Sequence, residues 1–66
     1  MNRLEFFKRR REIIQYAKEN GSIWNYTKDG DKNDLYIFGQ LVKDATLTID
    51  RVDEKKGITF YTFNDH

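Results

Sequence analysis

The sequence predicts an α+β domain in two layers, with an N-terminal helix packed on a four-stranded antiparallel meander sheet. Apolar residues recur with a helical period over residues 2–20, and alternation with a period of two takes over after Gly21. Short turn-like segments separate the alternating runs, which makes successive strands antiparallel neighbours. At 66 residues the chain has room for one core, so we expect a single domain over residues 1–66.

The helix is predicted over residues 2–20 because both of its ends are signalled. Asn2 can cap the first turn, and Glu5 follows three residues later, as in a capping box. Asn20 and Gly21 supply a left-handed stop. An apolar stripe that should pack on the sheet is formed by Phe6, Phe7, Ile13, Ile14 and Ala17.

The remainder of the chain is predicted to form four strands, because each run alternates and is rich in Thr, Ile, Tyr and Phe. The strands are expected over residues 22–28, 34–42, 45–53 and 58–64. The separating segments are residues 29–33, 43–44 and 54–57, which contain Asp, Asn, Gly and Lys. These short connections predict a meander.

Side-chain parity decides which residues face the helix, because a slip of one residue turns every side chain over. We expect residues 30–33 and 54–57 to be four-residue loops, the second closed by Asp53 and Ile58. This register predicts a core of Trp24, Tyr26, Leu35, Ile37, Leu41, Ala45, Leu47, Ile49, Ile58 and Phe60. The opposite face then carries the aromatic residues Tyr36, Phe38, Tyr61 and Phe63.

Exposed aromatic residues on an open sheet face are typical of a binding surface. Tyr36, Phe38, Tyr61 and Phe63 are therefore the candidate partner-binding residues of a non-enzymatic interaction or regulatory protein that binds another protein or itself. Asp50 lies on the same predicted face with no Lys or Arg, which favours a protein partner over nucleic acid. The alternative interpretation is that the register is wrong and these rings belong to the core.

The run Lys8, Arg9, Arg10 and Arg11 is the second candidate site, and it predicts nucleic-acid binding as the alternative function. Residues 1–20 carry six cations and three anions, so the helix is basic. Four successive residues on a helix point in four directions, however, which favours a solvated helix with ion pairs over a binding surface. If the chain does bind nucleic acid, the aromatic residues of the sheet would stack on single-stranded bases.

Residues that carry chemistry are scarce. The chain has no cysteine, its one histidine is His66 at the end, and its one serine is Ser22. Residues 29–34 begin like a calcium loop, but Asp34 and Gln40 replace the required Gly and Glu, so a hairpin loop is the simpler interpretation. We therefore expect no enzyme, cofactor, metal site or small-molecule substrate.

Membrane and targeting patterns are also missing. No stretch approaches 18 uncharged apolar residues, and the N-terminal segment has neither a long apolar run nor a cleavage pattern. These observations, with the lack of cysteine, predict a cytoplasmic protein that does not enter a membrane.

Overall fold

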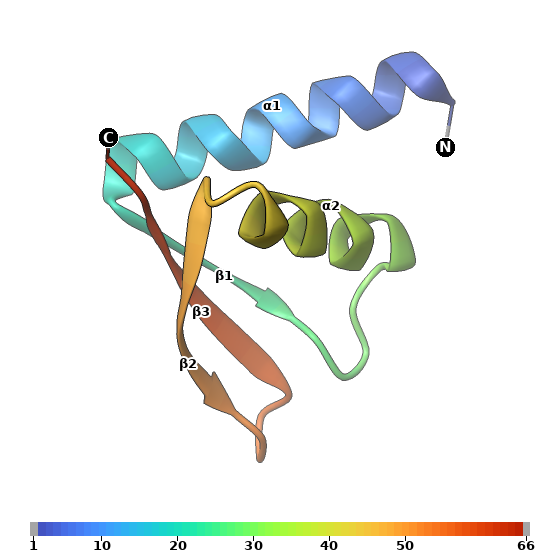
Figure 1. Cartoon of the computed structure of the whole chain (residues 1–66). Helices are drawn as coiled ribbons and strands as arrows, with labels where there is room; N and C mark the ends of the chain where they lie inside the picture. Colours follow the sequence, from blue (N-terminus) through green and yellow to red (C-terminus); the bar gives the residue numbers. More distant parts are fainter. Residues whose placement is uncertain (1, 66) are drawn as a thin grey trace.

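A computed structural model describes residues 2–65, which form two helices and one antiparallel sheet of three strands (Figure 1). The elements in chain order are α1 (Arg3–Asn20), β1 (Ser22–Tyr26), α2 (Lys32–Lys43), β2 (Leu47–Asp53) and β3 (Ile58–Phe63). The strand order is β1-β3-β2, so the C-terminal strand lies in the centre of the sheet. The α+β class and the helix-on-sheet packing are as predicted, whereas the four-stranded meander is wrong.

Helix α1 begins and ends where its sequence signals lie. The side chain of Asn2 accepts a hydrogen bond of 2.9 Å from the backbone N–H of Glu5, which satisfies one of the free donors of the first turn. Gly21 has φ 78°, and its N–H donates to the Ala17 carbonyl over 2.7 Å. The helix predicted over residues 2–20 is confirmed.

Helix α2 replaces the strand that was predicted over residues 34–42. Its N-cap is Asp31, whose side chain accepts from the backbone N–H groups of Asn33 and Asp34. Ile37 and Phe38 are neighbours in sequence and both are buried. A strand would place these two side chains on opposite faces, whereas a helix can turn both toward one core. The dense apolar sequence of this segment fits both a helical period and a strand period, and in the structure it forms a helix with Ile37, Phe38 and Leu41 buried.

The three observed strands lie within predicted runs but are shorter than expected at one end. The turn between β2 and β3 is closed by the predicted pair of Asp53 and Ile58. The pairing then shifts between Ile49 and Arg51, so that Asp50 has no opposite residue in β3. This irregularity is a β-bulge, and it reverses the parity of the first half of β2 relative to β3.

Because of the bulge, the core residues predicted for the sheet are partly wrong. Leu47 now lies opposite Phe63, and Ile49 lies opposite Tyr61, instead of sharing a face with Ile58 and Phe60. Trp24 and Tyr26 lie opposite Phe60 and Ile58 and are 45% and 54% exposed, so they belong to the outer face and not to the core.

The core lies between the two helices and the inner face of the sheet. Its buried apolar residues are Ile13, Ala17, Ile37, Phe38, Leu41, Leu47 and Tyr61. The rings of Phe38 and Tyr61 are 4.7 Å apart and join α2 to the central strand. Ile49 and Val52, farther along β2, stay about half exposed. The helices therefore cover one face of the sheet only in part and leave the other face open.

The bulge yields a direct test of this packing. Deleting Asp50 would restore regular pairing and turn Leu47 away from the core, so we expect the free energy of unfolding to fall by about 2 kcal/mol or more. Asp50→Ala keeps the extra residue and should change it by less than about 0.5 kcal/mol. Urea denaturation of both variants measures the difference, and equal stability of the two would contradict the assigned register.

Candidate functional site

The open face of the sheet carries a cluster of aromatic side chains. Trp24 in β1 lies opposite Phe60 in β3, and Phe60 lies opposite Arg51 in β2. The rings of Trp24 and Tyr26 meet edge to face at 5.0 Å, and the Arg51 guanidinium carbon lies 4.2 Å from the centre of the Phe60 ring. We call Trp24, Tyr26, Phe60 and Arg51 the aromatic face. It is a continuous surface over all three strands.

The sheet around the aromatic face is electrically balanced. Residues 47–63, which form the β2–β3 hairpin, contain three cations and three anions, and residues 22–26 of β1 contain none. The cations are Arg51, Lys55 and Lys56, and the anions are Asp50, Asp53 and Glu54. The surface therefore has aromatic rings without a surplus of positive charge.

The four aromatic residues predicted from the sequence do not form one exposed face. Phe38 and Tyr61 are buried in the core, and Phe63 is partly buried against it. Burial raises the pKa of Tyr61 above its ordinary value, an effect that a hydrogen bond with Thr59 partly opposes. Tyr36 is exposed, but it lies on α2 and contacts Phe6 of α1 with ring centres 5.8 Å apart.

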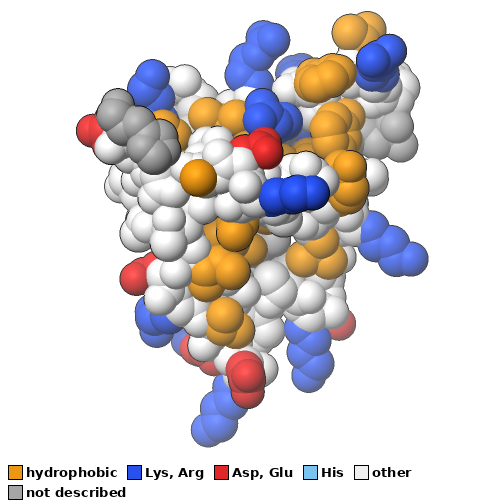
Figure 2. All heavy atoms as spheres, in the orientation of Figure 1, with side chains coloured by type: hydrophobic (Ala, Val, Ile, Leu, Met, Phe, Trp, Pro, Cys, Tyr) orange, Lys and Arg blue, Asp and Glu red, His pale blue; other side chains and the backbone are white. Residues whose placement is uncertain are grey.

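A second exposed apolar patch lies where α1 begins. Figure 2 shows hydrophobic side chains over this end of the molecule, with Lys and Arg side chains among them. Leu4 and Phe7, three residues apart on α1, are 83% and 51% exposed. The ring of Phe6 contacts both Phe7 and the exposed Tyr36. Tyr36 thus belongs to this patch and not to the sheet.

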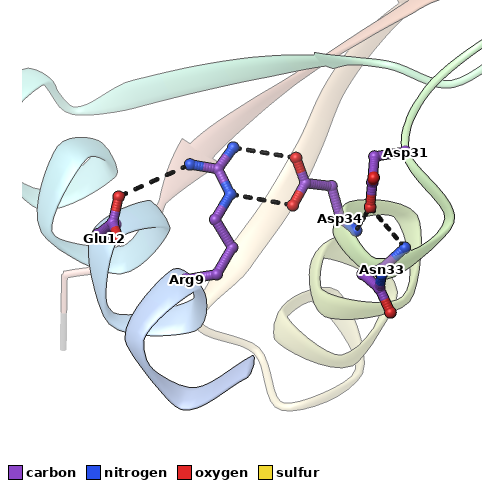
Figure 3. A network of polar contacts seen from close by, with 5 residues as sticks. All are labelled: Arg9, Glu12, Asp31, Asn33 and Asp34. Atoms are coloured by element: carbon purple, nitrogen blue, oxygen red, sulfur yellow. Dashed lines mark hydrogen bonds and ion pairs between the residues drawn. The ribbon is translucent and has the colours of Figure 1, made fainter. Parts of the chain in front are cut away.

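Two residues of the basic run hold the helices together. Arg9 donates to Asp34 through Nε and Nη2, both at 2.9 Å, and its Nη1 lies 3.9 Å from Glu12 (Figure 3). The hydrogen bonds to Asp34 raise the pKa of Arg9, an effect that burial partly opposes. Arg10 reaches the other end of α2, where its Nη2 lies 3.7 Å from Asp44.

Lys8 and Arg11, the other two cations of the run, are exposed and make no ion pair among the residues that the structure describes. The basic run is therefore divided. Arg9 and Arg10 serve the fold, and only Lys8 and Arg11 are free to meet an external anion.

Among the described residues, the buried side chain of Asn25 has no hydrogen-bond partner. Asn25 of β1 is 8% exposed on the inner face, and neither its carboxamide nitrogen nor its oxygen has a hydrogen-bond partner within residues 2–65. It lines a hollow of about 220 Å³ together with Arg9, Asp31, Asp34 and Phe38 and with parts of β1 and the following loop. A buried carboxamide without partners destabilises the fold by about 1–3 kcal/mol. The predicted register puts Trp24 and Tyr26 in the core and therefore puts Asn25, which lies between them, on the opposite face, so sequence reasoning missed this buried residue.

The described residues offer no site for a metal ion. Over residues 2–65, no three His, Cys, Asp or Glu side chains are grouped closely enough to bind one. His66, the single histidine, lies outside the described residues. Neither helix of residues 2–65 is long and apolar enough to cross a membrane.

Comparison of the chain with protein-family models, with curated protein sequences and with solved structures gave no match. Function must therefore be inferred from the geometry of the site.

The ion pair between Arg9 and Asp34 should contribute measurably to stability. Asp34→Asn removes the charge-assisted, two-point contact, and we expect the free energy of unfolding to fall by about 1 kcal/mol at low salt. Asp44→Asn is the matched control, because its contact with Arg10 is longer and more exposed, and it should have less than half that effect. Thermal and urea denaturation measure both. If Asp44→Asn lowered the free energy of unfolding more than Asp34→Asn, the stabilising role given to the Arg9–Asp34 pair would be contradicted.

Asn25→Leu is expected to stabilise the protein. Leu has the same number and branching of side-chain heavy atoms as Asn, and the hollow beside this position can take its larger volume. The substitution replaces two unpartnered polar atoms with apolar ones, so the free energy of unfolding should rise by about 1–3 kcal/mol. Thr59→Val, at the position opposite Asn25, is the control, because the Thr59 hydroxyl has a partner in Thr27 and its loss should not stabilise. Destabilisation by Asn25→Leu would show that the carboxamide is satisfied.

Proposed function

We propose that this chain is a non-enzymatic binding module that recognises another protein through the aromatic face. The observation that carries this proposal is the contiguity of Trp24, Tyr26 and Phe60 with Arg51 on an uncovered, electrically balanced sheet. Trp, Tyr and Arg dominate the binding energy of protein interfaces. We also expect the cytoplasmic location that a sequence without cysteine favours.

The balance of charge favours a protein over nucleic acid. A nucleic-acid surface needs cations along the path of the phosphates, and the sheet has as many anions as cations. The basic run supplies only Lys8 and Arg11, because Arg9 and Arg10 are engaged with Asp34 and Asp44. Aromatic rings remain as the main feature of the surface, and they suit an apolar partner.

The size of the face favours a short segment of a partner over a second copy of this chain. Three strands of about five residues span roughly 17 Å by 14 Å, or roughly 240 Å². A stable complex buries about 800 Å² on each partner, so two such faces packed together would not hold a dimer. A segment that contacts the face and its borders can bury more by following the surface.

A matched pair of tyrosines tests this proposal. Tyr26 lies on the aromatic face and Tyr36 on α2, and they are 54% and 59% exposed. Random peptides displayed on phage are selected against the unmodified chain, and the enriched peptides are synthesised. Their affinity should fall at least about tenfold for Tyr26→Ser and stay unchanged for Tyr36→Ser. The reverse order would contradict the proposal.

The unmodified chain also tests the alternative function, which is nucleic-acid binding. Trp24 is the single tryptophan and lies on the aromatic face, so its fluorescence reports on any ligand bound there. Single-stranded oligonucleotides should leave the fluorescence unchanged at low salt. Quenching that disappears steeply as salt rises would show nucleic-acid binding and would overturn the choice of a protein partner.

A further inference from the structure

The outer edge of β1 presents backbone groups that are not paired with another strand within residues 2–65. Pairing with β3 is marked by hydrogen bonds from Thr27 N–H to the Gly57 carbonyl and from Phe63 N–H to the Gly21 carbonyl. In an antiparallel pair, residues alternate in direction, so the intervening Ser22 and Trp24 point their N–H and carbonyl groups away from β3. β1 is an edge strand, and these groups face outward.

The two edges of the sheet differ in how they are protected. β2 has a bulge and the charged residues Asp50, Arg51 and Asp53, which are features that prevent unwanted pairing of edge strands. β1 has no charged residue, no proline and no bulge. The edge of β1 is therefore suited to accept another strand, whereas the edge of β2 is not.

A groove runs between α1 and the edge of β1. Its volume is about 340 Å³, and it is lined by Arg9, Glu12, Ile13, Tyr16, Ile23 and Trp24. Glu12 and Ile13 each lie three or four residues from both Arg9 and Tyr16, so the residues from α1 share one side of the helix. An added strand would place its inner side chains beneath this face of α1, against Ile13 and Ile23.

The unpartnered carboxamide of Asn25 lies farther along the same strand. The hollow that it lines shares Arg9, Ile23 and Trp24 with the groove, so the two spaces adjoin. Side chains of neighbouring strands lie side by side on one face with a period of two. An inner side chain next to Asn25 that has a hydroxyl or a carboxamide would supply the missing partner.

We propose that the segment of the partner protein binds as an additional strand along the edge of β1. It pairs with the backbone of Ser22 and Trp24, places an apolar side chain beside Ile23, and places a Ser, Thr, Asn or Gln beside Asn25. The pattern is an apolar residue and a polar residue two positions apart. This inference rests on the proposed function, because it specifies how a partner segment reaches the aromatic face.

The loop after β1 limits the length of the added strand. A side chain at Gly30 would collide with the carbonyl oxygen of Tyr26, which shows that the loop backbone covers this oxygen. The open part of the edge thus ends near Tyr26. The bound segment is short, and it pairs with only part of β1.

Backbone methylation tests the inference without changing a side chain. The 66-residue chain is made by chemical synthesis with a methyl group on the backbone nitrogen of Trp24, which removes the outward donor and obstructs an approaching strand. The control carries the methyl group on the backbone nitrogen of Lys55, in the exposed turn after β2. Circular dichroism and thermal denaturation verify that both fold.

Peptides selected against the unmodified chain should bind the Trp24-methylated protein at least about tenfold more weakly and the Lys55-methylated protein equally well. Their sequences should share the apolar and polar pattern, and selection against Asn25→Leu should shift the polar position to an apolar residue. In the free protein, the Trp24 amide hydrogen should exchange rapidly, and a bound peptide should protect it.

The outcomes separate this inference from the proposed function. Loss of binding with Tyr26→Ser but not with methylated Trp24 would overturn strand addition and leave the aromatic face in place. Loss with methylated Trp24 alone would support strand addition and overturn the role of the face. Selection that enriches no peptide would overturn the inference, as would a dimer of the free chain that methylation of Trp24 dissociates.

Discussion

The β-bulge in β2 determines which side chains of this sheet meet the helices. Because Asp50 has no partner in β3, the residues before it are shifted relative to those after it. Leu47 can therefore join Tyr61 in the core while Arg51 joins Phe60 on the outside. A regular hairpin would have to expose either Leu47 or Tyr61. The core, the aromatic face and the protected edge of β2 all depend on this one additional residue.

Apolar packing holds the helices over the sheet, and two consecutive arginines of α1 join it to α2. Arg9 binds Asp34 in the first turn of α2, and Arg10 approaches Asp44 at its C-cap. Contacts at both ends fix the position of α2 relative to α1, which a small core alone would leave less well defined. The same arrangement engages two of the four cations of the basic run in contacts within the fold.

Capping residues, turn residues and apolar periodicity predicted the elements that are formed by short-range contacts, namely helix α1 and the turn between β2 and β3. The α1 helix follows from Asn2, Gly21 and the apolar period, and the β2–β3 turn follows from its closing pair. Helix α2 was missed because Ile37 and Phe38 belong to a dense apolar run that fits two periods, and tertiary packing decides between them. The bulge has no sequence signature of its own. Because the position of the bulge could not be predicted, the sequence could not show which side chains of β2 share a face with those of β3.

The candidate site was also predicted only in part, because its composition is a property of the sequence whereas its membership depends on tertiary structure. An aromatic-rich open sheet face was predicted, and the sheet does carry one, but it contains Trp24, Tyr26 and Phe60 in place of Tyr36, Phe38, Tyr61 and Phe63. The composition of the chain predicts that some rings will be exposed, because a domain this small cannot bury them all. Which rings are exposed depends on the register, which is a long-range property. The free edge of β1 likewise follows from strand order and not from any motif.

Nuclear Overhauser spectroscopy tests the orientation of the sheet most directly. The account predicts contacts between the ring protons of Phe38 and Tyr61, whose centres are 4.7 Å apart, and between the Arg51 side chain and the Phe60 ring. Contacts between Phe60 and the core residues Phe38 or Leu41, with Tyr61 free of both helices, would show that the opposite face of β3 meets the helices. That result would contradict the register, the aromatic face and the proposals that depend on them.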